Sequence, residues 1–129
     1  MTFCLLGYCQ RTGQTGIGYT TVTLAGGGTS PFYTYSGDIV VVQAYGNIRT
    51  AIAGAKSLDT GASLDATVDA MAKSDDAFSF RQVGIMTRDG KHTARTGTNA
   101  RPWAGHDIGD DYVAMGNVLA GEAVVSAMA

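Results

Sequence analysis

The strongest constraint on the fold is a pair of β-hairpin signals, one in each half of the chain. Residues 3–22 contain two strand-like runs separated by a short polar turn, in which Gly13 can adopt a positive φ. Residues 78–97 repeat this design around the turn Arg-Asp-Gly-Lys at 88–91, and Asp-Gly between two strand-like runs is a strong hairpin signal. The sequence therefore predicts two layers of antiparallel sheet.

Between the hairpins the apolar residues change to helical spacing. After an apolar strand expected at residues 39–43, Asn47 can cap a helix over residues 48–57 whose apolar side chains fall on one face. Ser63 can cap a second helix over residues 63–73. Two helices are therefore expected to cover the sheets.

The last part of the chain predicts a strand at residues 111–115 and a helix from Glu122. Strands and helices segregated in this order indicate an α+β layered fold, and 129 residues are enough for one domain, residues 1–129. The expected core residues are Leu5, Ile17, Val41, Ile52, Val68, Val83 and Val113.

Composition narrows the classes of partner and the compartment. A net charge of -2 with only nine Lys and Arg gives no basic surface for nucleic acid. No apolar run is long enough to span a membrane and no signal sequence is visible at the N-terminus. Cys4 and Cys9 lie an odd number of residues apart on one expected strand, so they point to opposite faces and cannot easily form a disulfide. We therefore expect a cytoplasmic protein with no nucleic-acid or membrane partner.

Neither a metal nor a cofactor is expected. Asp107, Asp110 and Asp111 could offer oxygen ligands to a cation, but their spacing does not match a calcium loop, and a solvated acidic turn is the simpler interpretation. The Gly-Ile-Gly at 16–18 lacks the third glycine and the following helix of a dinucleotide site.

Four short motifs carry a resemblance to a known family. They are the opening Met-Thr-Phe-Cys, the Gln-Ala-Tyr-Gly-Asn at 43–47, the Trp-Ala-Gly-His at 103–106 and the Gly-Asn-Val-Leu-Ala-Gly at 116–121. In these motifs the chain resembles an uncharacterised bacterial and archaeal family assigned to the Ntn-hydrolase (N-terminal nucleophile) fold. The resemblance implies an αββα sandwich of antiparallel sheets.

Members of that family usually continue several dozen residues further, so the resemblance implies a fold that is incomplete at its C-terminus. Residues 122–129 form an apolar helix start without a C-cap glycine. We expect self-association, or a second chain that completes the fold, to cover the remaining edge strand or apolar face.

Thr2 is the first candidate catalytic residue. Ntn chemistry requires a Thr, Ser or Cys at the start of the first strand with a free α-amino group, which serves as the base for its own side chain. Thr2 fits this requirement if Met1 is removed, and an ordinary β-branched strand residue is the alternative interpretation. Strand alternation places Cys4 on the same face, where the family more often has Ser, so Cys4 is the alternative nucleophile.

Asn117 and His106 complete the expected catalytic set. Asn117 could stabilise an oxyanion through its side-chain amide or a backbone N–H, and His106 could orient a substrate or transfer a proton. Both residues also have structural interpretations, in a turn and as a hydrogen-bond partner. Trp103, Gly27 and Gly28 are the expected substrate contacts, the glycines from a loop at the rim of the site.

The leading functional prediction is hydrolysis of an amide-like bond in a small-molecule substrate. The alternative is a catalytically silent binding or assembly protein with the same fold, because a fold alone does not establish function. The free amine of Thr2 distinguishes the two.

Overall fold

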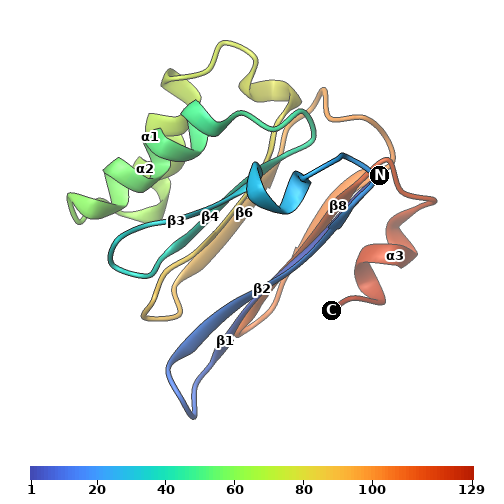
Figure 1. Cartoon of the computed structure of the whole chain (residues 1–129). Coiled ribbons are helices and arrows are strands. Elements are labelled where there is room, and N and C mark those ends of the chain that lie inside the picture. The colour runs from blue at the N-terminus through green and yellow to red at the C-terminus, as the bar shows by residue number, and fades with distance from the viewer.

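The computed structural model describes residues 1–129 as a mixed α/β fold with two antiparallel sheets and three helices (Figure 1). The first sheet has the strand order β2-β1-β8-β7 and the second the order β3-β4-β5-β6. The strands are β1 (Thr2–Cys9), β2 (Gln14–Thr21), β3 (Pro31–Tyr33), β4 (Ile39–Gln43), β5 (Gln82–Met86), β6 (His92–Thr96), β7 (Ala104–Ile108) and β8 (Tyr112–Asn117). The helices are α1 (Ile48–Asp59), α2 (Leu64–Lys73) and α3 (Glu122–Ser126), with short 3-10 turns η1 (Gly26–Gly28) and η2 (Phe78–Phe80).

The sheets lie face to face, with helices on their outer faces (Figure 1). One apolar cluster fills the space between the sheets, with Leu6, Val41 and Met115 among its members. A second cluster joins β4 and β5 to α1 and α2, and a third, smaller cluster joins the outer face of the first sheet to α3. None of the three helices is long and apolar enough to cross a membrane.

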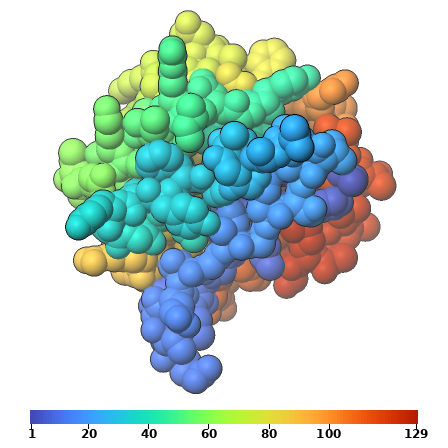
Figure 2. Space-filling model, viewed as in Figure 1, coloured from blue at the N-terminus to red at the C-terminus, as the bar shows by residue number.

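Both expected hairpins form. β1 pairs with β2 from Thr2 opposite Thr21 to Cys9 opposite Gln14, and the tip of this hairpin projects beyond the body of the molecule (Figure 2). The second hairpin begins later than predicted, at Gln82, because residues 78–80 turn as η2. Two short edge strands, β3 and β7, were not predicted, since three to five residues with several glycines nearby give little periodic signal.

The helix starts follow the predicted caps. The side chain of Asn47 accepts a hydrogen bond from the backbone N–H of Arg49, and that of Ser63 accepts one from Ala66. The helix from Glu122 also forms, although it ends at Ser126. The predicted helices are therefore confirmed.

The expected core is confirmed in part. Val41, Val83 and Val113 are buried. Leu5 is wrong as a core residue, because it alternates with the inward-facing Cys4 and points to the outer face of the first sheet, where α3 leaves it 36 % exposed. Three further residues are only half-buried: Ile17, Ile52 and Val68.

The two sheets approach closely at Gly84 in β5. A Cβ atom added there would lie 2.7 Å from Met115 Cε and 3.2 Å from Leu6 Cδ1, both from the opposite sheet. The missing side chain thus allows the strands that carry Leu6 and Met115 to pack against β5.

A buried carboxylate fixes the turn between β4 and α1. Asp75 accepts hydrogen bonds from Asn47 Nδ2 at 3.0 Å and Thr50 Oγ1 at 2.6 Å, and its carboxylate pairs with Arg81 Nε at 2.9 Å. Arg81 also donates to the main-chain carbonyl of Tyr45. These contacts, above all the one from Arg81, hold the pKa of Asp75 well below its usual range. The turn is therefore tied to the segment that leads into β5.

We expect Val41→Asn to destabilise the protein by several kcal/mol, because the amide would be buried among apolar side chains without a partner. Urea unfolding followed by circular dichroism measures the change. Leu24→Asn, at a residue that is 95 % exposed, is the matched control and should alter the free energy of unfolding by less than about 0.5 kcal/mol. Equal effects of the two substitutions would show that Val41 is not in the core.

We expect Asp75→Asn to cost about 3 kcal/mol at pH 7, because it leaves Arg81 without its buried partner. Because the pKa of Asp75 is lower in the folded than in the unfolded protein, where it is about 3.9, its stabilisation is complete above that pH. The stabilisation is lost progressively as the pH falls from there through the folded-state pKa. Urea unfolding at pH values from 7 down to 3 should therefore show the difference between wild type and variant shrinking in acid. Asp76→Asn, at the exposed neighbouring residue, is the control. A difference in unfolding free energy between wild type and Asp75→Asn that stays constant at all pH values would contradict a lowered pKa for Asp75.

Candidate functional site

A cavity of about 680 Å³ opens at one end of the two sheets. The start of β1 contributes Thr2, the end of β8 contributes Asn117, and the end of β4 contributes Gln43. Gly28 from η1 and Tyr45 from the β4–α1 turn also line it. We call this cavity the Thr2 pocket.

Thr2 and Asn117 are directly opposite each other in the ladder between β1 and β8. Residues paired in this way have Cα atoms about 4.5 to 5.5 Å apart, so both side chains reach the same end of the space between the sheets. Thr2 is 7 % exposed, and its hydroxyl lies 3.1 Å from that of Thr21 on β2. Thr2 and Asn117 therefore line one cavity, whereas Cys4, which the sequence placed with them, does not line it.

Three buried side-chain amides meet at the pocket, and two of them, Gln43 and Asn117, line it. Gln82 Oε1 accepts hydrogen bonds from Gln43 Nε2 at 2.9 Å and from Asn117 Nδ2 at 3.2 Å. Gln82 and Gln43 are almost fully buried, and the oxygen of Gln43 has no hydrogen-bond partner. An unpartnered buried acceptor is uncommon in folded proteins and indicates a place where a ligand or an ordered water belongs.

Gln82 also connects the two sheets. Its Nε2 lies 2.8 Å from the carbonyl oxygens of both Gly105 and Gly116, which belong to β7 and β8 of the opposite sheet. A third contact joins it to Thr96 Oγ1 at 3.0 Å on β6. One side chain therefore sets the separation of the sheets at the end where Thr2 lies.

Three residues around the pocket have a left-handed backbone conformation, which residues other than glycine rarely adopt. Ala44, Tyr45 and Val118 have φ values of 57°, 67° and 55°, and all three residues line the pocket. Such left-handed residues are costly and cluster at functional sites, where surrounding contacts hold them in place. The bond from Arg81 to the carbonyl of Tyr45 is one such contact.

Cys4 does not reach the pocket. Its side chain is 0 % exposed and packs in the cluster between the sheets. Burial raises the pKa of the Cys4 thiol to about 12, so the reactive thiolate is scarce at neutral pH. Cys9, on the opposite face, is exposed.

His106, Trp103 and Gly27 also lie away from the pocket lining. His106 is on the edge strand β7, where its Nδ1 lies 2.8 Å from Thr96 Oγ1. Desolvation of the ring lowers the pKa of His106, against the opposing charge of Asp107. Trp103 packs over Gly105 on the outer face of the first sheet. Of the two glycines expected as substrate contacts, only Gly28 lines the cavity.

Sequence reasoning missed Gln43 and Gln82, although the strand pattern contained a signal for both. Gln43 is in phase with Ile39 and Val41, and Gln82 is in phase with Met86, so each amide falls on the apolar inner face of its strand. A polar side chain at a position that alternation assigns to the core is a candidate for a network or a site.

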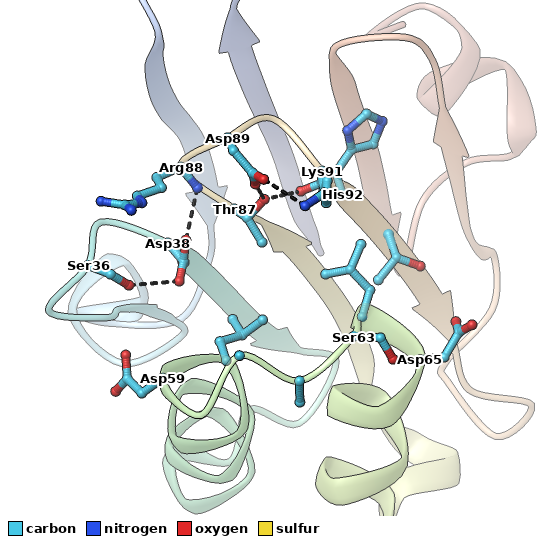
Figure 3. Close-up of a pocket in the computed structure, with 15 residues that line it drawn as sticks. Ser36, Asp38, Asp59, Ser63, Asp65, Thr87, Arg88, Asp89, Lys91 and His92 are labelled. Carbon is cyan, nitrogen blue, oxygen red and sulfur yellow. Dashed lines mark hydrogen bonds and ion pairs between the residues drawn. The ribbon is translucent and has the colours of Figure 1, made fainter.

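A second cavity, of about 880 Å³, lies at the opposite end of β4 (Figure 3). Two of its four carboxylates have protein partners: Asp38 accepts hydrogen bonds from Thr34, Ser36 and the backbone N–H of Arg88, and Asp89 pairs with Lys91. The other two, Asp59 and Asp65, are exposed. Figure 3 shows the bonds of Asp38 with Ser36 and Arg88 and the contact of Asp89 with Lys91. The second cavity contains no unpartnered buried group, so the Thr2 pocket is the stronger candidate.

The three carboxylates of the acidic turn, Asp107, Asp110 and Asp111, do not gather around one point. No group of three or more metal-ligating side chains gathers anywhere in the structure. Asp111 accepts from Gln10, and Asp107 accepts from the hydroxyl of Tyr112.

Comparisons with known proteins place the chain in a family. Residues 2–129 match the family of unknown function DUF1028. A crystal structure of a Silicibacter pomeroyi protein that carries the same family designation superposes with a TM-score of 0.89 at 25 % sequence identity. The superposition covers 98 % of this chain and 59 % of that protein, so the chain spans about three fifths of its length. No curated protein matches the chain significantly. With the match extending over residues 2–129, the chain belongs to DUF1028.

Proposed function

We propose that the Thr2 pocket is the active site of a hydrolase that cleaves a small amide-like bond, with Thr2 as nucleophile in an Ntn-hydrolase-like fold. The observation that carries this proposal is the position of Thr2. It is the first residue of β1, it lines the cavity, and it lies opposite Asn117. The arrangement of two antiparallel sheets between helices is compatible with that fold.

The reaction requires removal of Met1, which frees the α-amine of Thr2. The amine, with an ordinary pKa near 7.7 to 8.0, takes the proton from Oγ1 as the oxygen attacks the substrate carbonyl carbon. Collapse of the tetrahedral intermediate breaks the carbon–nitrogen bond, and the amine gives its proton to the leaving nitrogen. Water then attacks the ester on Thr2, which releases the acid and restores the hydroxyl.

The backbone turns the N–H of Thr2 toward β8. The carbonyl of Met1 accepts hydrogen bonds from Val22 N at 3.4 Å and Thr21 Oγ1 at 3.3 Å, so it points toward β2. Across a trans peptide bond the N–H of Thr2 points the opposite way, toward β8 and Asn117. The freed amine would therefore lie on the side of β1 where Asn117 is paired.

Asn117 is the second residue of the proposed site. Its side-chain nitrogen already donates to Gln82, so one N–H of the amide is committed to the network and one is left for an oxyanion. Cys4 is a weaker nucleophile candidate than Thr2, since it is buried below the pocket with a raised pKa. His106 and Trp103 would act only indirectly, because neither lines the cavity.

The contacts of Met1 support a second candidate function. With Met1 retained, the nitrogen of Thr2 belongs to a peptide bond and is not a free amine. The carbonyl oxygen of Met1 accepts hydrogen bonds from β2. The base would then be missing, and the pocket would serve a catalytically silent binding protein. The mass of the intact chain distinguishes the two functions, because only the hydrolase requires the loss of Met1.

We expect a strained cyclic ester, such as a β-lactone, to acylate Thr2 in the processed protein. The hydroxyl opens the ring, so the intact mass rises by the mass of the whole reagent, and peptide mapping should locate the adduct on Thr2. Thr2→Ala should remove the adduct without unfolding the protein. Thr20→Ala, at an exposed position on β2, should keep it. A Met1-free protein that forms no adduct, or forms it elsewhere, would rule out Thr2 as the nucleophile.

A further inference from the structure

The hydrogen bonds of Gln82 determine the orientation of all three buried amides. The nitrogen and oxygen of a side-chain amide are hard to distinguish by position alone, but a main-chain carbonyl can only accept. Gln82 faces two such carbonyls, those of Gly105 and Gly116, each at 2.8 Å. The atom on that side must be its nitrogen, and its oxygen must face the other way.

The other two amides follow from this assignment. Both side chains that approach the oxygen of Gln82 must present nitrogen, as Gln43 does at 2.9 Å and Asn117 at 3.2 Å. Their own oxygens are therefore turned away from Gln82. Gln43 Oε1 is buried without a partner, whereas the oxygen of Asn117 receives no protein donor and is open to the pocket. Two residues that line the pocket thus offer acceptors to which no protein group donates, and the one on Gln43 is buried.

The charge of the pocket lining favours a hydrogen-bond donor that is itself uncharged. Arg101 is the one charged side chain that lines the pocket, and no carboxylate does. An ammonium group would enter without a counter-charge and near a positive one, whereas a neutral N–H group meets no such cost. Ile48 and Val118 are exposed apolar side chains at the pocket and can contact a short apolar tail.

We propose that the Thr2 pocket recognises a neutral primary carboxamide, whose N–H groups donate to the side-chain oxygens of Asn117 and Gln43. This proposal rests on the proposed function and names its substrate class. Attack by Thr2 Oγ1 on the carboxamide carbon would break the carbon–nitrogen bond and release ammonia, with the proton supplied by the amine of Thr2. Hydrolysis of the ester by water would then release the carboxylic acid.

Four small probes of similar size test the recognition directly. They are propionamide, N,N-dimethylpropionamide, propionate and propylammonium, each titrated into the ¹⁵N-labelled, Met1-free protein while the side-chain amide signals are followed by NMR. Propionamide should shift the Asn117 and Gln43 signals in a saturable way. The other three should bind at least about tenfold more weakly, since each lacks the N–H groups or carries the wrong charge. Equal binding of N,N-dimethylpropionamide, or tighter binding of propylammonium, would overturn the proposal.

A substitution locates the binding site. Asn117→Ala removes one acceptor and should weaken propionamide binding by about tenfold. The control is Asn99→Ala, because Asn99 is exposed and donates only to Ser79. Unchanged binding in a folded Asn117→Ala protein would overturn the proposal. If that variant does not fold, the four probes titrated into the wild-type protein still test whether the pocket prefers a primary carboxamide.

Ammonia release, measured in the same samples, separates this proposal from the proposed function. Selective propionamide binding without ammonia release would support carboxamide recognition and contradict the hydrolase. A β-lactone adduct on Thr2 without propionamide binding would support the nucleophile and contradict carboxamide recognition.

Discussion

The end of the fold that carries the candidate site depends on one buried side chain, Gln82. Its nitrogen contacts the carbonyls of Gly105 and Gly116 in the opposite sheet, and its oxygen receives Gln43 and Asn117. Apart from hydrogen bonds at the β6–β7 edge, such as Thr96 to His106, the sheets are joined by apolar packing, which tolerates small sliding movements of one face over the other. Hydrogen bonds weaken steeply when their distance or angle changes. The bonds of Gln82 therefore resist sliding and fix the relative position of the strands that bear Thr2 and Asn117.

A second set of contacts fixes the rim of the pocket. The left-handed residues Ala44 and Tyr45 follow β4 directly, and Arg81 holds the carbonyl of Tyr45 while Asp75 holds Arg81. Because Arg81 precedes Gln82 in the chain, the rim and the amide network are positioned by adjacent residues at the start of β5. Strain at the rim is thus supported by a buried ion pair, as is common at binding sites.

Much of the fold was predictable because its signals are local. The turn at Asp89-Gly90 and the caps Asn47 and Ser63 act on residues within four positions of themselves, and the sequence shows them directly. Thr2 was proposed as a site residue through the family resemblance, and the structure pairs it with Asn117 at the edge of one cavity. The amide network was not predicted, because Gln43, Gln82 and Asn117 are far apart in the chain and meet only when the sheets stack. Leu5 was also misassigned because its burial depends on tertiary contacts. Strand alternation shows that Leu5 lies on the outer face of the first sheet but not how much of that face the short helix α3 covers.

The most direct test of this account is a crystal structure of the chain after removal of Met1. The account predicts that β1 still begins at Thr2, paired with Asn117, and that the freed α-amine and the hydroxyl of Thr2 both open into the pocket. It also predicts that the Asn117 nitrogen stays on Gln82, with the side-chain oxygen free. A structure in which the start of β1 leaves β8, or in which the Asn117 amide turns away from Gln82, would contradict it.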